Sequence, residues 1–169
     1  MADVIHGERV TLRPVGPEDR LRLAEIVREP AVARWWGADA ELDEDAAMFV
    51  IEVDGETAGG IQYWEEDDPD YRHAGIDVFL AAAFQDRGLG SDAVRTLARH
   101  LFEDVGHHRI TIDPAAANAR AIRAYERVGF KPVGVLRQYE RGPDGTFHDG
   151  LLMDMLRGEL RESDPKRAK

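Results

Sequence analysis

The stretch that decides the fold is Gln85-Asp-Arg-Gly-Leu-Gly90, which lies between the strand-like run Gly75–Leu80 and a helix expected from about Gly88 to Phe102. Gly88 and Gly90 let the backbone approach a ligand without a Cβ in the way. The first N–H groups of the helix are unpaired, and the helix dipole adds positive potential there, so the turn favours an anion. We therefore predict a diphosphate site on the backbone amides of residues 87–91, with Arg87 adding charge.

This turn differs from the better-known phosphate loops. It lacks the lysine and the Ser/Thr of a P-loop, and it lacks the third glycine of the dinucleotide fingerprint. Glycines at a helix start are also common in turns that bind nothing, so the turn alone leaves both readings open.

A second motif follows in Asn118-Ala-Arg-Ala-Ile-Arg-Ala-Tyr-Glu-Arg-Val-Gly-Phe130. The pattern predicts a helix that begins at Asn118, a good N-cap residue, and ends at Gly129, a residue that accepts a left-handed conformation. Tyr125 lies seven residues after Asn118, near the same helical face. An Asn here is usually a cap and a helical Tyr usually packs, so these roles stand beside any functional ones.

The remaining pattern completes an α/β sandwich with a central mixed, mostly antiparallel sheet flanked by helices. A strand from Glu8 to Arg13 precedes a helix that starts near Pro17. The strands 48–53 and 57–63 flank the hairpin turn Asp54-Gly55, and the acidic run 65–70 is expected to be a loop. The later strands are expected at 109–113, 130–138 and 147–156.

Length and composition limit the possible functions. The 169 residues fit one domain, 1–160, with a charged and frayed tail at 161–169. The net charge of −11 argues against nucleic-acid binding, and there is no cysteine for thiol chemistry. No apolar run approaches the roughly 20 residues of a membrane-spanning helix, and no secretory signal is visible, which suits a cytoplasmic protein.

Taken together, the two motifs resemble the GNAT superfamily of acetyl-CoA-dependent N-acetyltransferases, and the resemblance covers nearly the whole chain. It implies that the turn binds the coenzyme A diphosphate and that the strand Ile76–Leu80 splays from its neighbour to pair with the pantetheine arm. It implies acetyl-CoA as cosubstrate. The implied coenzyme contacts are Val78, Phe79, Leu80, Gln85, Arg87, Gly88, Leu89, Gly90, Ser91, Asn118, Ala121 and Tyr125.

A narrower resemblance, to aminoglycoside 6'-N-acetyltransferases, concerns the acceptor. It lies in Arg34-Trp-Trp-Gly37, Trp64-Glu-Glu-Asp-Asp-Pro69, Gly75-Ile-Asp77 and Thr111-Ile-Asp-Pro114. It implies that Asp77 and Asp113 contact an amino sugar, that the Trp pair helps to form the pocket, and that the protein is connected with antibiotic resistance. The segment Thr146–Met153 departs from this pattern and resembles ribosomal-protein N-terminal acetyltransferases, so a protein α-amine is the alternative acceptor.

The resemblance suggests a mechanism in which Asp77 receives a proton from the amine. A backbone N–H near Phe79 or Leu80 would bond the thioester oxygen, and Tyr125 would protonate the sulfur. Asp77 has a purely structural alternative, an ion pair with a residue such as Arg72. Asp113 precedes a proline and has the alternative of starting a turn. A coenzyme-A-binding sensor without catalysis is the third functional reading.

The other candidates are acceptor-binding groups. Of Trp35 and Trp36, one is expected in the core and one in a pocket wall. Glu65 and Glu66 are expected to attract a cationic acceptor, with a solvated loop as the alternative. His107 and His108 are expected to be solvated on a turn, without a metal. The partner is expected to be an amine-bearing small molecule, and the chain a monomer or a homodimer.

Overall fold

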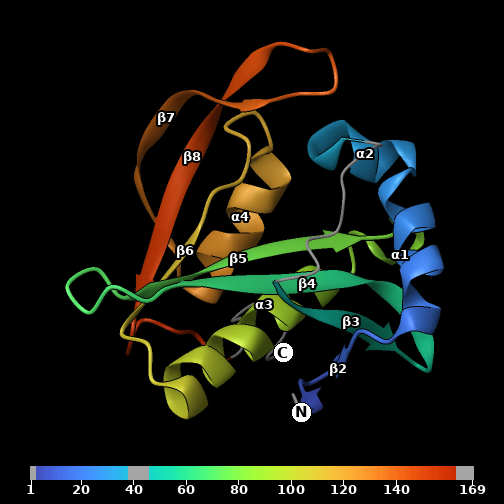
Figure 1. Ribbon diagram of the computed structural model, residues 1–169, viewed down its shortest axis with the longest axis horizontal. Coiled ribbons are helices and arrows are strands. Elements are labelled where there is room, and N and C mark those ends of the chain that lie inside the picture. Colours follow the sequence, from blue (N-terminus) through green and yellow to red (C-terminus); the bar gives the residue numbers. More distant parts are fainter. Residues whose placement is uncertain (1–2, 38–45, 163–169) are drawn as a thin grey trace.

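The computed structural model describes residues 3–37 and 46–162, which form one eight-stranded sheet with helices on both faces (Figure 1). The strands are β1 (Ile5–His6), β2 (Thr11–Pro14), β3 (Ala47–Val53), β4 (Glu56–Glu66), β5 (His73–Leu80), β6 (Arg109–Ile112), β7 (Lys131–Arg141) and β8 (Phe147–Leu156). The helices are α1 (Arg20–Val27), α2 (Pro30–Trp36), α3 (Leu89–His100) and α4 (Ala119–Val128). Single 3₁₀ turns cover Pro17–Asp19 and Ala82–Phe84, and a π-helical turn covers Leu101–Val105. The fold class expected from the sequence is confirmed.

The sheet opens between β5 and β6. Its order is β1-β2-β3-β4-β5-β6-β8-β7, and every neighbouring pair is antiparallel except β5 with β6. These two parallel strands pair only at Ala74 with Ile110 and at Gly75 with Thr111. Beyond Gly75 the strands separate, and Figure 1 shows β7 and β8 running steeply across the direction of β4 and β5. The expected splaying of this strand is therefore present.

The two faces of the sheet carry two cores. Ile51 and Leu97 belong to a cluster in which α3 and α4 cover one face, while Leu23, Val50 and Phe79 belong to a second cluster beneath α1 and α2. Burying a side chain of this size contributes about 1.5–3 kcal/mol. Because both faces of the central strands are covered and β5 stays paired with β4 as far as Leu80, β5 remains part of the sheet after it leaves β6.

Local turn chemistry fixes the ends of the elements that form the site. Asp54 and Gly55 both have positive φ, 50° and 81°, as a tight hairpin turn requires. Gly88 is the N-cap of α3 with a φ of 75°, and the side chain of Asn118 caps α4 by accepting a hydrogen bond from the Ala121 N–H at 3.3 Å. Gly129 ends α4 with a φ of 128°. All four expectations about these turns and caps are confirmed.

Only part of the acidic run 65–70 is the loop that the sequence predicted. Strand β4 continues to its end because Glu65 pairs with Ala74 and Glu66 pairs with His73 in the antiparallel register. Only residues 67–72 form the turn. Glu65 and Glu66 are consequently the last residues of β4, directly before the turn that leads into β5.

The described start of the expected tail is bound to the domain. The Arg161 N–H donates to the Val128 carbonyl at 2.9 Å, its own carbonyl accepts from Arg95 Nε at 2.7 Å, and Glu162 pairs with Arg99 at 2.8 Å. The expectation of fraying from residue 161 is wrong for these two residues. The rest of the expected tail, 163–169, lies outside the described residues. Among the described helices, none has the length and apolar character needed to cross a bilayer.

Candidate active site

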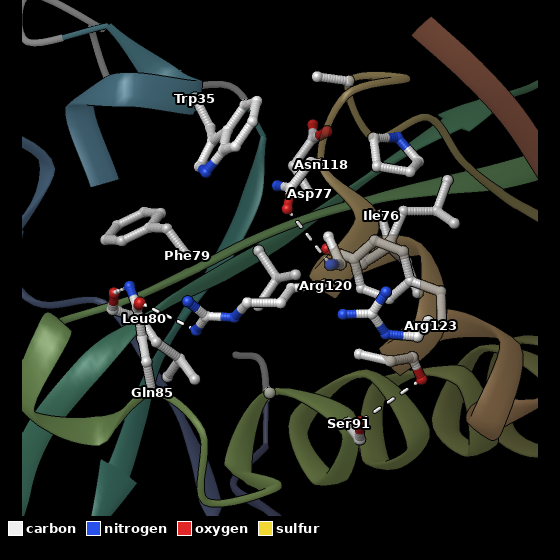
Figure 2. Close-up of a pocket in the computed structure, with 18 of the residues that line it drawn as sticks. Trp35, Ile76, Asp77, Phe79, Leu80, Gln85, Ser91, Asn118, Arg120 and Arg123 are labelled. Carbon is white, nitrogen blue, oxygen red and sulfur yellow. Dashed lines mark hydrogen bonds between the residues drawn. The ribbon is translucent and has the colours of Figure 1, made fainter. Parts of the chain in front are cut away.

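A cleft of about 1830 Å³ lies where the sheet opens. Its walls come from β5, the turn before α3, α4, the end of α2, and residues that follow β6 and end β7. Figure 2 shows side chains from these elements facing a common space. Elements far apart in the sequence thus meet at the point where β5 and β6 separate.

The floor of the cleft is the anion turn. Gly88, Leu89, Gly90 and Ser91 line it at the start of α3, where the first backbone N–H groups are unpaired by the helix. The one acidic residue of this first turn, Asp92, is occupied elsewhere because its carboxylate accepts the N–H groups of residues 9 and 10 at 2.8 and 3.0 Å. The Asp92 carboxylate therefore does not occupy the first N–H groups of α3, which a diphosphate needs as donors.

Arginines surround this end of the cleft. Arg120 donates to Gln85 Oε1 at 3.2 Å and lies 3.0 Å from Asp86 Oδ1, so its guanidinium spans the cleft beside the turn. Figure 2 shows Arg120 and Arg123 reaching from α4 into the same space. Arg9 also lines the cleft. These side chains give the anion turn cationic neighbours that bidentate phosphate binding can use.

Strand β5 and Asn118 form the middle of the cleft. Residues 76–80 line it on the side that β6 has left, where the strand offers backbone groups for an added chain. The amide of Gln85 holds this strand end, because its Nε2 donates to the Leu80 carbonyl at 2.9 Å. Asn118 and Ala121 line the opposite wall, and the Oδ1 of Asn118 is engaged as the cap of α4.

Two carboxyl groups lie at the inner end. Asp77 accepts a hydrogen bond from Gln62 Nε2 at 3.3 Å, and burial raises its pKa, with a further rise from the charge of Asp113. Burial also raises the pKa of Asp113, against a hydrogen bond from the Tyr139 hydroxyl that lowers it. Such groups accept a proton more readily than exposed carboxylates do. The suggested ion pair of Asp77 with Arg72 is wrong, because Arg72 bonds backbone carbonyls of residues 105 and 106 instead.

Tyr125 lies beside these carboxyl groups. Burial raises its pKa above the usual value of 10.0, and the charges of Asp77 and Asp113 raise it further, so its hydroxyl stays protonated at neutral pH. Its ring packs edge-on against Phe130, with 6.3 Å between centroids. Within the described part of the chain, no group forms a hydrogen bond with the hydroxyl. This protonated hydroxyl is therefore available to donate to a bound group.

Tryptophans form the outer wall. Trp36 packs on Phe79 at 4.9 Å between ring centroids, but Trp35 and Trp36 are both partly exposed and both line the cleft, so the expected division of the pair into one core and one wall residue is not present. Both lie at the end of α2 itself rather than after it. Trp64 also lines the cleft, and its indole covers Gly75 so closely that an added Cβ there would lie 2.2 Å from it. Three indole side chains thus line this part of the cleft, and the Arg34 guanidinium lies over the Trp35 ring at 4.6 Å.

Three residues that were predicted to bind a ligand lie outside the lining of the cleft, namely Glu65, Glu66 and Arg87. Glu65 bonds His107 Nε2 at 2.6 Å, and neither it nor Glu66 lines the cleft. The expectation of a solvated His107 is wrong, because the turn after α3 buries this ring completely, while His108 is exposed. Arg87 turns its guanidinium over the Phe84 ring at 5.6 Å. In residues 3–37 and 46–162, no group of three or more potential ligands is placed to hold a metal ion.

Several lining residues were missed by sequence reasoning. Arg120 and Arg123 are three residues apart, so the α4 pattern could have placed them on one face of the helix, but not beside the anion turn. Tyr139 and Glu140 carried no such signal, because only an irregularity in β7 brings them to the cleft. Trp64 was part of a quoted segment but was not assigned to the pocket.

The site is thus a coenzyme-type cleft, with an anion turn at one end and proton-accepting and proton-donating groups at the other. Residues 14–130 match the model of the acetyltransferase (GNAT) family, and the chain belongs to this family of N-acetyltransferases, enzymes that use acetyl-CoA as cosubstrate.

Similar proteins agree with this membership. The chain is 33% identical over 167 residues to aminoglycoside N(6')-acetyltransferase type 1 of Klebsiella pneumoniae, a match that covers 82% of this chain and 80% of that protein. The structure of aminoglycoside acetyltransferase AAC(6')-Ib with coenzyme A and kanamycin is similar with a TM-score of 0.72 and 29% identity, covering 88% of this chain and 95% of that one. RimJ of Mycobacterium smegmatis, with coenzyme A disulfide, shares the fold with a TM-score of 0.82 at 23% identity, covering 96% of this chain and 91% of that one.

Proposed function

We propose that this protein acetylates a primary amine of an aminoglycoside-like small molecule by direct attack in a ternary complex with acetyl-CoA. The observation that carries the proposal is the placement of Asp77 and Asp113, two partly buried carboxyl groups, at the inner end of the coenzyme-type cleft. The 33% identity to an aminoglycoside N(6')-acetyltransferase over most of both chains supports the choice of acceptor.

The coenzyme is proposed to lie along the cleft in one direction. Its diphosphate would accept hydrogen bonds from the amides of residues 88–91, with Arg120 and Arg123 as cationic neighbours. Its pantetheine arm would pair with the free side of β5 and pass Asn118. This direction leads the thioester toward Tyr125, since that side chain lies on α4 two turns after the cap.

The chemistry needs a neutral amine, an oxyanion partner and a proton for the sulfur. Asp77, whose pKa is raised by burial, would accept a proton from the incoming ammonium directly or through water. The nitrogen then forms a bond to the thioester carbon while the carbonyl oxygen takes the electron pair and bonds a backbone N–H near Phe79 or Leu80. The carbon–sulfur bond breaks as the sulfur takes a proton from Tyr125, which recovers one from the amine through solvent.

The acceptor would lie between the aromatic wall and the carboxyl groups. Trp35 and Trp64 offer flat surfaces for a sugar ring, and Asp77 and Asp113 offer anionic partners for its amines. We do not assign that role to Glu65 and Glu66, because Glu65 is held by His107 away from the cleft.

The test is a panel of acceptors incubated with acetyl-CoA, with release of the free thiol followed over time. The panel holds kanamycin, spermidine and a peptide with a free N-terminus. Turnover of kanamycin that is lost in Asp77→Asn supports the proposal. Turnover of the peptide alone would replace it with the N-terminal acetyltransferase function that the segment 146–153 suggested, and binding of acetyl-CoA without any turnover would favour a sensor.

A further inference from the structure

Strand β7 contains a wide bulge opposite Asp149. Leu136 pairs with Gly150 and Glu140 pairs with His148, so residues 137–139 together face the single residue Asp149. Gln138 has a φ of 45°, a left-handed conformation that is rare for a residue with a side chain. The Asp149 carboxylate stabilises this conformation by accepting the Gln138 N–H at 2.8 Å. Bulges of this kind often re-aim side chains beside active sites.

The same segment of β8 also holds the chain that carries Asp113. The Asp149 carbonyl accepts the Ala116 N–H at 2.9 Å, and the Leu151 N–H donates to the Pro114 carbonyl at 2.9 Å. Residues 113–116 and the bulge thus lie on opposite sides of one short piece of β8. Both are fixed to Asp149, which contributes its side chain to one and its backbone to the other.

The bulge delivers Tyr139 onto Asp113. The ring of Tyr139 lies over Gly150, where an added Cβ would approach Cδ1 to 3.1 Å, and its hydroxyl donates a hydrogen bond to the Asp113 carboxylate. That bond raises the pKa of Tyr139 to about 12, so the hydroxyl remains a donor at neutral pH. Tyr139 is therefore the side chain that interacts with the Asp113 carboxylate at this end of the cleft.

The next residue adds a third carboxylate to this end of the cleft. Glu140 is exposed on β7 and lines the cleft with Asp77, Asp113 and the neighbouring Arg141, and partial burial together with the charges of the two aspartates raises its pKa. Across residues 3–37 and 46–162, no arginine, lysine or histidine forms an ion pair with any of the three. Three acidic groups that interact and lack a cation favour a ligand that brings more than one positive charge.

We propose that Glu140 binds a second ammonium group of the acceptor, and that Tyr139 is a positioning residue that fixes Asp113 for the same ligand. This inference rests on the proposed function and narrows it. The acceptor carries at least two cationic groups, one at Asp77 where acetyl transfer occurs and another between Asp113 and Glu140. A molecule with a single amine can reach Asp77 but gains nothing from the other two carboxylates.

The test compares kanamycin, which has several amines, with glucosamine, which has one. Glucosamine is measured as a substrate or, where turnover is slow, as a competitive inhibitor. Glu140→Gln should lower the preference for kanamycin, the ratio of its kcat/KM to that of glucosamine, about fivefold. The change should come through KM rather than kcat, because one charge contact is lost. Tyr139→Phe should act in the same direction through KM. The control Glu103→Gln removes an equal charge from an exposed position outside the cleft and should leave the preference unchanged.

The outcomes separate this inference from the proposed function. Suppose that the wild type acetylates kanamycin but that Glu140→Gln lowers kcat/KM equally for kanamycin and glucosamine, or for neither. Glu140 then does not bind a second charge, and the inference is overturned while the proposed function stands. If the wild type acetylates only the peptide, the proposed function fails and takes the inference with it. A smaller loss of the preference for kanamycin in Glu140→Gln at 0.5 M salt would agree with the proposed ionic contact.

Discussion

Replacing Tyr125 with phenylalanine isolates one hydroxyl at the point where the thiol must leave. The ring contact with Phe130 at 6.3 Å survives the change, and such aromatic pairs contribute about 0.5–1.5 kcal/mol. In the described residues the hydroxyl has no protein hydrogen-bond partner to lose. We therefore expect the free energy of unfolding to change by less than about 0.5 kcal/mol. Any large effect of this variant must then come from the chemistry.

The expected effect on turnover is large. General acid catalysis contributes at least about a hundredfold, which corresponds to about 2.7 kcal/mol of the barrier. Because burial and the neighbouring carboxylates keep Tyr125 protonated, kcat should fall at every pH without a shift of the acidic limb, which belongs to Asp77. Release of free thiol from acetyl-CoA measures kcat, and Tyr63→Phe, a partly buried tyrosine outside the cleft lining, is the matched control. A Tyr125→Phe enzyme with kcat within threefold of the wild type would refute the assignment.

Three further substitutions probe other parts of the cleft. Asp77→Asn should abolish most activity yet raise Tm at pH 7. Because the pKa of Asp77 is raised in the folded protein, the wild type loses stability as the pH rises and this carboxyl group ionises. Thermal melts of the two proteins should converge toward pH 4, and a lower Tm for the variant at pH 7 would contradict this. Gly88→Ala puts a side chain at a φ of 75°, which should cost about 1 kcal/mol of stability and weaken coenzyme A binding in calorimetry; unchanged binding would place the diphosphate elsewhere. Gly75→Ala should displace the Trp64 indole and raise KM for the acceptor but not for acetyl-CoA, and equal effects on both would count against an aromatic acceptor wall.

Features set by local chemistry could be predicted from the sequence. The glycine at the start of α3, the Asn118 cap and the Asp54-Gly55 turn each need only a few adjacent residues, and the structure contains all three. The order of strands and helices follows from hydrophobic periodicity, which is also local. The expectation that Asp77 lies at the cleft came from the family resemblance, and the structure places Asp77 among the lining residues.

Features set by pairing across long sequence separations could not be predicted in the same way. Glu65 was expected near the acceptor, but its partner His107 lies 42 residues away and is buried by a π-helical turn with no clear sequence signal. Tyr139 reaches the cleft only because β7 bulges opposite Asp149, and an unbroken alternation of side chains would have placed it differently. A sequence pattern gives the residue types along a strand but not the register in which the strand pairs.

The most direct measurement of the central claim is a crystal structure with coenzyme A and kanamycin bound together. We expect the diphosphate to lie against the amides of residues 88–91, the sulfur to lie within about 3.5 Å of the Tyr125 hydroxyl, and an acceptor nitrogen to lie beside Asp77. A coenzyme bound away from the start of α3, or a sulfur distant from both Tyr125 and Asp77, would contradict it.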